Sequence, residues 1–298
     1  VSSDQSYIRT RTMTAATGTS YVDKYAYYDG LGRPIQTVQQ GITPLENDLV
    51  TLRQYDGFGR ESRTWLPAVV AGNGGAYVPL VRIMSEAKEN YGDRKAYSYP
   101  IYESSPLDRV TELYGPGEKW QIADRAERIR YLTNDGTDSL ECLRFSASDY
   151  GPTDTVVVVS GTGQYIPGEM YVSRIEDEDG NAAFEFRDKR NLVVLVRQVV
   201  PTGIGREFHD TYYLYDTAGN LRAVLPPMAS ASMQDGGPWS SDTSEVLRRY
   251  AYLYRYDGRN RCVAKRLPGA DWIRIIYDRT DTPVFTQDGE LRLQGEWA

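Results

Sequence analysis

The chain has 298 residues, of which 40% are hydrophobic, 12% aromatic and 25% charged. Its net charge of −7 and isoelectric point near 5.0 give a nucleic-acid role little electrostatic support. The apolar fraction and a mean hydropathy of −0.54 are low for one dense core, and they favour extended sheets that water contacts on at least one face. No hydrophobic run approaches the roughly 20 residues of a membrane-spanning helix, so no membrane span is predicted.

The first part of the chain is predicted to be strands with one helix. Residues 1–20 are Ser- and Thr-rich and unpatterned, which indicates a strand-like or frayed lead segment. Residues 21–67 hold two hairpins, and the glycine-rich stretch 68–77 is predicted to be a loop. Residues 97–132 are predicted to be strands that prolines interrupt. The stretch 79–90 is predicted to be a helix, because apolar residues recur at helical spacing: Leu80, Ile83, Met84 and Ala87.

Turn signals divide the middle of the chain. Asn134-Asp135-Gly136 indicates a turn between strands at 128–133 and 140–146. A short doubly apolar strand is predicted at 156–159. Gly161-Thr162-Gly163 lacks the third glycine of a dinucleotide fingerprint and a Walker lysine, so it is interpreted as a turn.

The last part of the chain is predicted to continue as a meander. Residues 228–244 form a polar crossover, and Asp242 with Glu245 resembles a capping box that opens a short helix. Asp288-Gly289 indicates one more hairpin. Loops near 134 and at 226–244 are the candidate sub-boundaries, but neither resembles a flexible linker. Residues 21–298 are therefore predicted to form one β-repeat body.

One motif recurs throughout the chain: an Asp followed three residues later by Gly, Asn or Asp occurs six times after aromatic-rich sequence. Gly, Asn and Asp tolerate a left-handed backbone best, and Asp can start a tight turn by bonding the backbone two residues on. The motif predicts repeated antiparallel β-hairpins and an all-β fold with one or two short helices. The predicted repeat-turn residues are Tyr28, Asp29, Gly32, Arg33, Tyr55, Asp56, Gly59, Arg60, Asp188, Asn191, Tyr215, Asp216, Gly219, Tyr256, Asp257, Asn260, Tyr277 and Asp278.

The sequence Tyr-Asp-x-x-Gly-Arg followed by a short strand resembles the YD repeat of bacterial Rhs proteins and of the C subunits of insecticidal toxin complexes. Four further blocks are similar to the stretch ahead of the main repeat array in one bacterial branch of that family: 105–110, 114–117 with Trp120, 216–227 and 254–268. The resemblance spans about residues 20–298. It departs from the family pattern in its irregular spacing and at Thr280-Asp281-Thr282, where Gly-Arg is expected.

The resemblance implies a non-catalytic role. In the family, YD hairpins spiral into a hollow shell that encloses a toxic C-terminal segment, so this chain is expected to be an early part of such a wall and a fragment of a longer protein. Its expected partners are further YD repeats and a C-terminal effector of its own chain, and its expected location is secreted or at the cell surface. The family's self-cleaving site contains Asp-Pro, which this chain lacks. The alternative is a cell-surface binding module for glycans or a protein partner that uses exposed Tyr and Trp, among them Trp65, Trp120, Trp239 and Trp272.

The residues themselves give no catalytic, cofactor or metal site. His209, the only histidine, is interpreted as a hydrogen-bonded structural residue beside Asp210. The acidic run 176–181 departs from the calcium-loop pattern, and a solvated hairpin turn is favoured over a calcium site. Cys142 and Cys262 are interpreted as small buried residues in preference to a disulfide.

Overall fold

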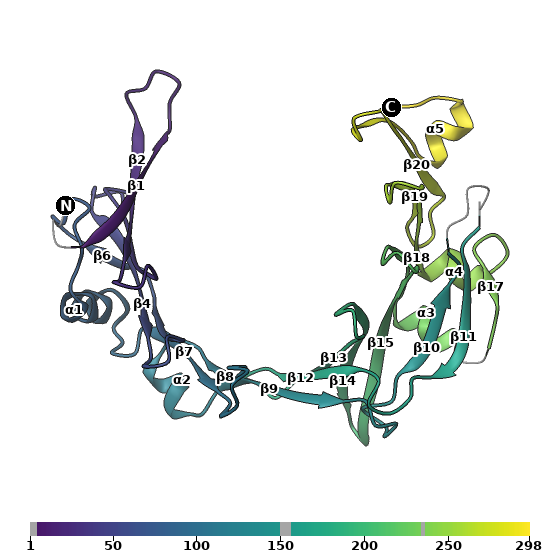
Figure 1. The fold of residues 1–298 in the computed structure, drawn as a ribbon, viewed down its shortest axis with the longest axis horizontal. Helices are drawn as coiled ribbons and strands as arrows, with labels where there is room; N and C mark the ends of the chain where they lie inside the picture. Colours follow the sequence, from purple (N-terminus) through teal and green to yellow (C-terminus); the bar gives the residue numbers. More distant parts are fainter. Residues whose placement is uncertain (1–4, 150–155, 234–235) are drawn as a thin grey trace. The chain divides into compact units, whose positions relative to one another are not determined.

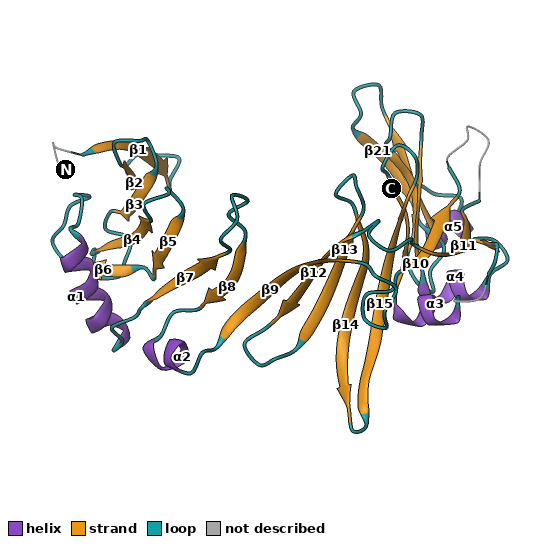
Figure 2. Ribbon diagram, turned by 60° about the horizontal axis from the view of Figure 1, so that its bottom comes forward, coloured by secondary structure: helices purple, strands orange, loops and turns teal. Residues whose placement is uncertain are grey.

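The structure, a computed structural model, describes residues 5–149, 156–233 and 236–298. Over these residues it contains twenty-one strands and five short helices, and the strands pair in antiparallel ladders (Figures 1 and 2). The predicted all-β class is therefore confirmed. The described residues contain no helix with the length and apolar character needed to cross a membrane.

The chain divides into two compact units. Unit 1 comprises Val1–Ile129 with Asp177–Asp179, and unit 2 comprises Arg130–Glu176 with Gly180–Ala298. The strands that begin in unit 1 are β1 (Ser6–Met13), β2 (Tyr21–Tyr28), β3 (Pro34–Gln39), β4 (Asp48–Tyr55), β5 (Glu61–Trp65), β6 (Ala68–Val70), β7 (Tyr97–Tyr102), β8 (Val110–Tyr114) and β9 (Ala126–Thr133). Its helices are α1 (Leu80–Tyr91) and α2 (Glu118–Ile122).

Unit 1 is built from hairpins joined edge to edge. β1 to β4 pair in chain order, and β4 then splits its pairing: its first half pairs with β6 and its second half with β5. From β5 the ladder continues through β7 and β8 to β9. The predicted loop at 68–77 therefore contains a strand, β6, at its start. Helix α2 has no counterpart in the prediction.

The lead segment, predicted over residues 1–20 to be either strand-like or frayed, forms an ordered strand at residues 6–13. β1 pairs with β2 along its whole length, from Ser6↔Tyr28 to Met13↔Tyr21. Every β1 residue is exposed, so no alternation of buried positions marks the strand. It is held instead by charge and aromatic contacts: Arg11 binds both carboxylate oxygens of the buried Asp23 at 2.8 Å and lies 3.6 Å from the centre of the Tyr21 ring.

Helix α1 lies where the spacing predicts it, and it covers the core of unit 1. Ile83 and Ala87 are fully buried in a cluster with Tyr27, Val38, Val50, Trp65 and Val78. Met84 does not join them, because 46% of its surface is exposed. The helix ends at Gly92, whose φ of 63° provides the left-handed C-cap.

The strands that begin in unit 2 run as a second meander with a small sheet beside it. They are β10 (Leu143–Ala147), β11 (Val158–Gln164), β12 (Tyr171–Glu176), β13 (Ala182–Arg187), β14 (Val193–Thr202), β15 (Gly205–Tyr215), β16 (Leu221–Leu225), β17 (Trp239–Ser240), β18 (Tyr252–Tyr256), β19 (Cys262–Arg266), β20 (Trp272–Tyr277) and β21 (Pro283–Gln287). The helices are α3 (Pro227–Ser232), α4 (Glu245–Tyr250) and α5 (Gly289–Gln294).

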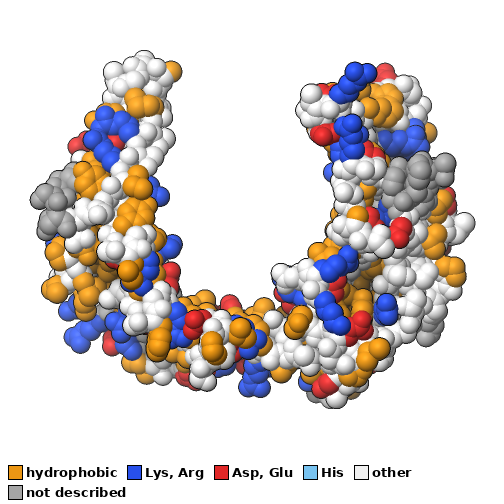
Figure 3. Space-filling view, in the orientation of Figure 1, with side chains coloured by type: hydrophobic (Ala, Val, Ile, Leu, Met, Phe, Trp, Pro, Cys, Tyr) orange, Lys and Arg blue, Asp and Glu red, His pale blue; other side chains and the backbone are white. Residues whose placement is uncertain are grey.

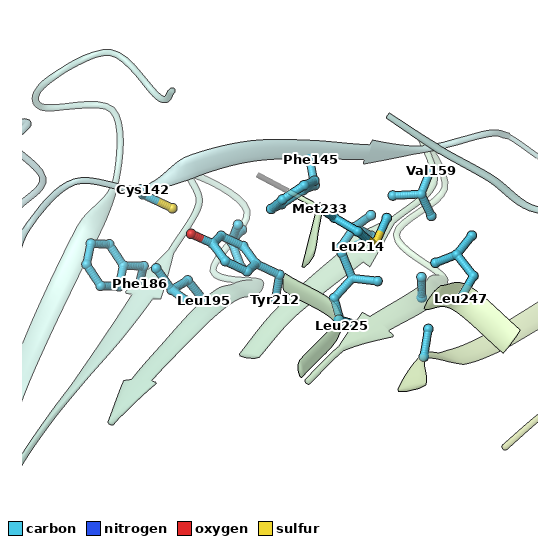
Figure 4. Packing of buried hydrophobic residues seen from close by; sticks show 14 of the residues in the cluster. Cys142, Phe145, Val159, Phe186, Leu195, Tyr212, Leu214, Leu225, Met233 and Leu247 are labelled. Atoms are coloured by element: carbon cyan, nitrogen blue, oxygen red, sulfur yellow. The ribbon is translucent and has the colours of Figure 1, made fainter. Parts of the chain in front are cut away.

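The core of unit 2 lies between these layers. β12 to β16 and β18 to β21 form the meander, while β10, β11 and β17 form a separate three-stranded sheet. Figure 4 shows Phe145 of the small sheet above Tyr212 of the meander, with ring centres 4.9 Å apart in an edge-to-face arrangement. Met233 and Leu247 close the same cluster next to helices α3 and α4.

Five expectations for this part are corrected. The predicted strand at 140–146 is β10, but it pairs with β11 and not across the 134–136 turn with β9. Gly161 and Gly163 lie inside β11 and not in a turn, and a Cβ at Gly161 would lie 3.0 Å from the Gly236 oxygen. The crossover at 228–244 contains most of α3 together with β17.

The other two corrections concern helix caps. Helix α4 is capped by the Ser244 hydroxyl, which accepts from the Leu247 amide, and not by Asp242. Asp288 opens helix α5 in place of the predicted hairpin, since its carboxylate accepts from the Leu291 amide at 2.9 Å.

The packing of α1 gives a first prediction. Ile83→Ala should lower the free energy of unfolding by about 2–5 kcal/mol, because it removes a fully buried side chain and leaves a cavity. Met84→Ala, the neighbouring exposed position, should change it by no more than about 0.5 kcal/mol. Urea denaturation of both variants checks the expectation. Equal losses would show that α1 does not cover the core with the Ile83 face.

Candidate functional site

The first motif copy forms a tight turn in which Asp29 organises the backbone. The Asp29 amide donates to the Arg33 carbonyl and the Gly32 amide donates to the Asp29 carbonyl, both at 3.0 Å. One carboxylate oxygen of Asp29 accepts from the amides of Leu31 and Arg33, both at 2.9 Å. Gly32 has a φ of 77°, and the strand register shifts between Tyr27 and Tyr28. This is a hairpin closed by a tight turn, a left-handed residue and a bulge.

The structure places the other motif copies in the same arrangement. In each, the Asp amide donates to the carbonyl four residues on at 2.8–3.0 Å, and the register shifts one residue before the Asp. The residue three after the Asp has a positive φ in every copy. These angles are 85° at Gly59, 65° at Asn191, 88° at Gly219, 60° at Asn260 and 63° at Asp281.

In three copies the turn is also closed by an arginine. Arg33 Nε donates to the second carboxylate oxygen of Asp29 at 2.7 Å, Arg60 Nε to Asp56 at 2.8 Å, and Arg261 Nε to Asp257 at 2.7 Å. The amide and guanidinium of Arg33 hold the pKa of the Asp29 carboxyl below its ordinary value. Both oxygens of each carboxylate are therefore occupied within their own turn.

In the other three copies the residue four after the Asp is not an arginine. Asn220 donates its side-chain amide to Asp216 at 3.0 Å, and the Thr280 hydroxyl contacts both oxygens of Asp278. At Asp188 the guanidinium comes from Arg190, two residues on, at 3.2 Å. The carboxylate keeps at least one additional donor in each case.

A seventh turn of related design was missed in the sequence. Tyr102 and Glu103 lead into a longer loop in which the Glu103 amide donates to the Arg109 carbonyl at 2.9 Å, and Asp108 has a φ of 51°. Arg109 binds both carboxylate oxygens of Glu103 at 2.8 Å. The longer Glu side chain spans the wider loop. The detectable signal was Tyr-Glu followed six residues later by Arg.

Neighbouring turns interlock through a tyrosine. The Tyr55 hydroxyl donates to the Pro34 carbonyl at 2.9 Å, and the Arg33 guanidinium lies 4.4 Å from the centre of the Tyr55 ring. The turn arginine thus binds its own aspartate and stacks on the tyrosine of the next turn.

The same pair of contacts recurs twice more. Tyr102 donates to the Glu61 carbonyl at 2.8 Å beneath Arg60, whose guanidinium is 4.4 Å from the ring centre. Tyr277 donates to the Cys262 carbonyl at 2.9 Å, and Arg261 lies 5.0 Å from its ring centre. In each case the tyrosine binds the carbonyl that follows the arginine of the preceding turn.

The left-handed residue of the next turn completes the interlock. Arg60 Nη1 donates to Asp108 at 2.8 Å and Arg261 Nη1 donates to Asp281 at 2.7 Å, while the Asn220 side chain donates to Asn260 at 2.9 Å. A Cβ at Gly59 would lie 3.0 Å from Arg33 Nη1, so the bare glycine leaves room for the arginine. The residue type at this position therefore depends on the side chain of the preceding turn that it contacts, as well as on its own φ.

The other candidate residues do not converge on a reaction centre. His209 is exposed on β15 opposite Gln198. In the acidic run, Asp179 forms an ion pair with Arg125 at 2.8 Å and Glu176 one with Arg174 at 2.5 Å. Cys142 is buried and Cys262 half-buried, both as free thiols. Within the described ranges, no three His, Cys, Asp or Glu side chains form a group that could hold a metal ion.

The aromatic residues proposed for glycan contact differ in accessibility. Trp65 is buried at 3% exposure, Trp239 and Trp272 are half-buried, and Trp120 is 40% exposed. On the face drawn in Figure 3, Lys and Arg side chains are interspersed with Asp and Glu. That face therefore presents no broad field of a single sign.

These features define a class: a repeat protein of antiparallel β-hairpins whose turns are braced by their neighbours. The model of a family described as a domain of unknown function, DUF6443, matches residues 3–133, which is under half of the chain. No curated protein matches the chain in sequence.

Solved toxin-complex structures share the fold. A crystal structure of TcdB2-TccC3-TEV has a TM-score of 0.55 at 14% identity over 95% of this chain and 12% of that one. The Photorhabdus luminescens Tc holotoxin pore has a TM-score of 0.52 at 14% identity, again over 95% and 12%. TcdB2-TccC3 without its hypervariable C-terminal region has a TM-score of 0.50 at 16% identity over 90% of this chain and 11% of that one. This chain thus spans a small part of the proteins whose fold it shares.

The left-handed residues give a second prediction. Gly59→Val should lower the free energy of unfolding by about 1–3 kcal/mol, because a β-branched residue is strained at a φ of 85° and its Cβ meets Arg33. Gly32→Val should lower the free energy of unfolding by less, because it has the same backbone strain but open space around its Cβ. Gly57→Val is the matched control, since that glycine has neither a left-handed φ nor a neighbour within 4 Å. Thermal unfolding of the three variants measures these differences. Three equal midpoint temperatures would contradict the turn geometry.

The Glu103 turn gives a prediction for pH dependence. The Arg109 guanidinium, with the Ser105 hydroxyl, lowers the pKa of Glu103 from 4.5 to about 2. Because the folded-state pKa is the lower one, this stabilisation is complete above about pH 4.5 and is lost as the pH falls toward 2. The free energy of unfolding should therefore decline on acidification, and less steeply in Arg109→Gln.

Urea denaturation at about pH 6 and about pH 3 measures the difference in slope. Arg94→Gln removes an exposed arginine that forms no ion pair within the described residues, and it should leave the slope of the parent unchanged. Parallel declines for the parent and Arg109→Gln would contradict the assignment.

Proposed function

We propose that this chain is a non-catalytic structural segment of an Rhs-type YD-repeat shell, which encloses or displays a C-terminal toxin or effector of a longer polypeptide. The observation that carries the proposal is the interlock of successive turns. Each bracing arginine serves its own hairpin and the one that follows, so the hairpins form a wall and not a set of separate units.

The chemistry of the interlock suits a wall. Repeat units that contact mainly their neighbours gain stability by addition of further units, and each added hairpin covers the exposed edge of the last. The shared fold with toxin-complex structures supports the same role. One of these proteins, TcdB2-TccC3, has a hypervariable C-terminal region, which parallels the C-terminal effector expected here.

The absence of catalysis is part of the proposal. The turn carboxylates are used by their own amides and arginines, which leaves them poor candidates for acid–base chemistry. Burial raises the pKa of the Cys142 thiol to about 12, so it is a poor nucleophile at neutral pH. No cofactor is required, and a secreted or surface location belongs to the same proposal.

Limited proteolysis of the natural polypeptide that carries this segment, followed by intact-mass analysis, tests the role. A protease-resistant body that co-elutes with a separately cleaved C-terminal piece is the expected result, because an enclosing wall retains its contents. Free digestion between small stable units, with no C-terminal piece retained, would overturn the shell and leave a surface-displayed module.

A further inference from the structure

Unit 1 has a concave surface whose role the wall does not explain. A depression of about 410 Å³ lies over strands β4, β5 and β7 and beside helix α2. β5 and β7 pair at Thr64↔Ser98 and Trp65↔Tyr97. The depression is lined by Tyr55, Tyr97 and Tyr99, by two cations and by the amides of two glutamines.

The lining carries an unbalanced positive charge. It includes Arg63 and Lys95 but no Asp or Glu, although the whole chain has more acidic than basic residues. Neither cation forms an ion pair with a described residue, and Arg63 instead lies 4.8 Å from the centre of the Tyr97 ring. Two carboxylates lie near Tyr99: Asp124 forms an ion pair with Arg128 at 2.8 Å, and Glu112 accepts from the Tyr114 hydroxyl at 2.9 Å.

Two other depressions of the same unit differ from it in one feature each. In the one between β1, β2 and the 72–74 loop, Arg9 and Arg11 are both bound to Asp23. The one lined by Lys24 and Arg53 has no tyrosine in its lining, and Arg53 lies 3.8 Å from Glu61. The depression at Arg63 and Lys95 combines two cations that form no ion pair within the described residues with tyrosine rings, which neither of the other two does.

The polar groups of this depression are held in place by neighbours. The Gln54 side-chain oxygen accepts from Trp65 Nε1 at 3.0 Å, which fixes the amide and leaves its NH₂ free as a donor. Gln121 donates its NH₂ to the carbonyls of Tyr97 at 2.9 Å and Gly115 at 3.1 Å, which leaves its side-chain oxygen free as an acceptor. Tyr97 packs on Trp65 with ring centres 4.8 Å apart. A ligand would meet an ordered set of donors, one acceptor and aromatic rings.

We propose that this depression binds a carboxylate-bearing sugar of the uronic-acid type. A guanidinium with an ammonium beside it recognises a carboxylate, tyrosine rings accept the apolar face of a sugar, and amides pair with its hydroxyls. The volume of about 410 Å³ suits one or two sugar rings. The inference is independent of the proposed shell.

The test uses the whole 298-residue chain labelled with ¹⁵N in its tryptophan indoles. The five tryptophans give five signals, and the Trp65 N–H reports on the site because it binds Gln54 in the lining. Titration with methyl β-D-glucuronide should shift the Trp65 signal saturably, with a dissociation constant on the order of 1 mM. Methyl β-D-glucoside, which lacks the carboxylate, should bind at least about ten times more weakly.

Variants identify the cations responsible. Arg63→Gln with Lys95→Gln should weaken glucuronide binding at least about tenfold, while the other four indole signals stay in place and show that the fold is intact. Lys88→Gln with Arg94→Gln removes the same charge from exposed positions outside the depression, and it should leave binding unchanged.

Three results would overturn the assignment. Equal binding of glucoside and glucuronide would show that the carboxylate is not recognised. Undiminished binding by the Arg63→Gln/Lys95→Gln variant would show that the sugar does not bind in this depression. A tetraglutamate peptide that binds more tightly than the glucuronide and displaces it would replace the sugar with an acidic peptide. None of these results bears on the proteolysis of the longer polypeptide, so this inference and the shell can fail separately.

Discussion

The turn arginine contacts two hairpins at once, and the stacking of the sheet depends on that double contact. Arg33 binds Asp29 of its own turn while its guanidinium covers the ring of Tyr55 in the next. A planar, permanently charged fork can do both, whereas an ammonium would have only one compact point of charge. The tyrosine returns the contact by donating to the carbonyl of Pro34. The turn is thereby closed by its own arginine–aspartate pair and attached to the next turn by the tyrosine.

This bracing accounts for a sheet with little apolar content. Individual exposed ion pairs contribute only about 0–1 kcal/mol, so no single arginine–aspartate pair holds the fold. The contacts recur along the chain, however, and each is shared between neighbours. Two buried clusters, one under α1 and one between the small sheet and helices α3 and α4, supply the hydrophobic burial. The hairpins between and beyond them depend more on turn chemistry than on a core.

The sequence predicts features that depend on neighbouring residues and misses features that depend on contacts between distant ones. The motif turns can be read directly because the left-handed residue admits few side chains, and Asp marks the turn start. The Glu103 turn is not predicted because its loop is longer and its acid is Glu in place of Asp, so it does not match the motif. β1 escapes because its residues are exposed and its contacts are charged. Asp288 misleads because Asp before Gly can open either a turn or a helix.

The interlock itself lies beyond local pattern. Tyr55 follows Arg33 by one strand pair, but Tyr102 meets Arg60 only after β6 and helix α1 have intervened. The partner of each arginine is therefore set by strand order and not by spacing. The same holds for the Arg63 and Lys95 depression, whose lining comes from five separate elements or loops. Strand order is decided by burial over the whole unit, so a short motif cannot encode it.

A double-mutant cycle between Arg33 and Tyr55 tests this account most directly. Urea denaturation of Arg33→Gln, Tyr55→Leu and the double variant gives their coupling free energy. The interlock predicts a coupling of about 0.5–1 kcal/mol, since the two side chains are in direct contact. Arg33 with Tyr102, which contacts Arg60 instead, should be additive. Additivity of the Arg33 and Tyr55 changes within about 0.3 kcal/mol would show that the turns stack without bracing one another.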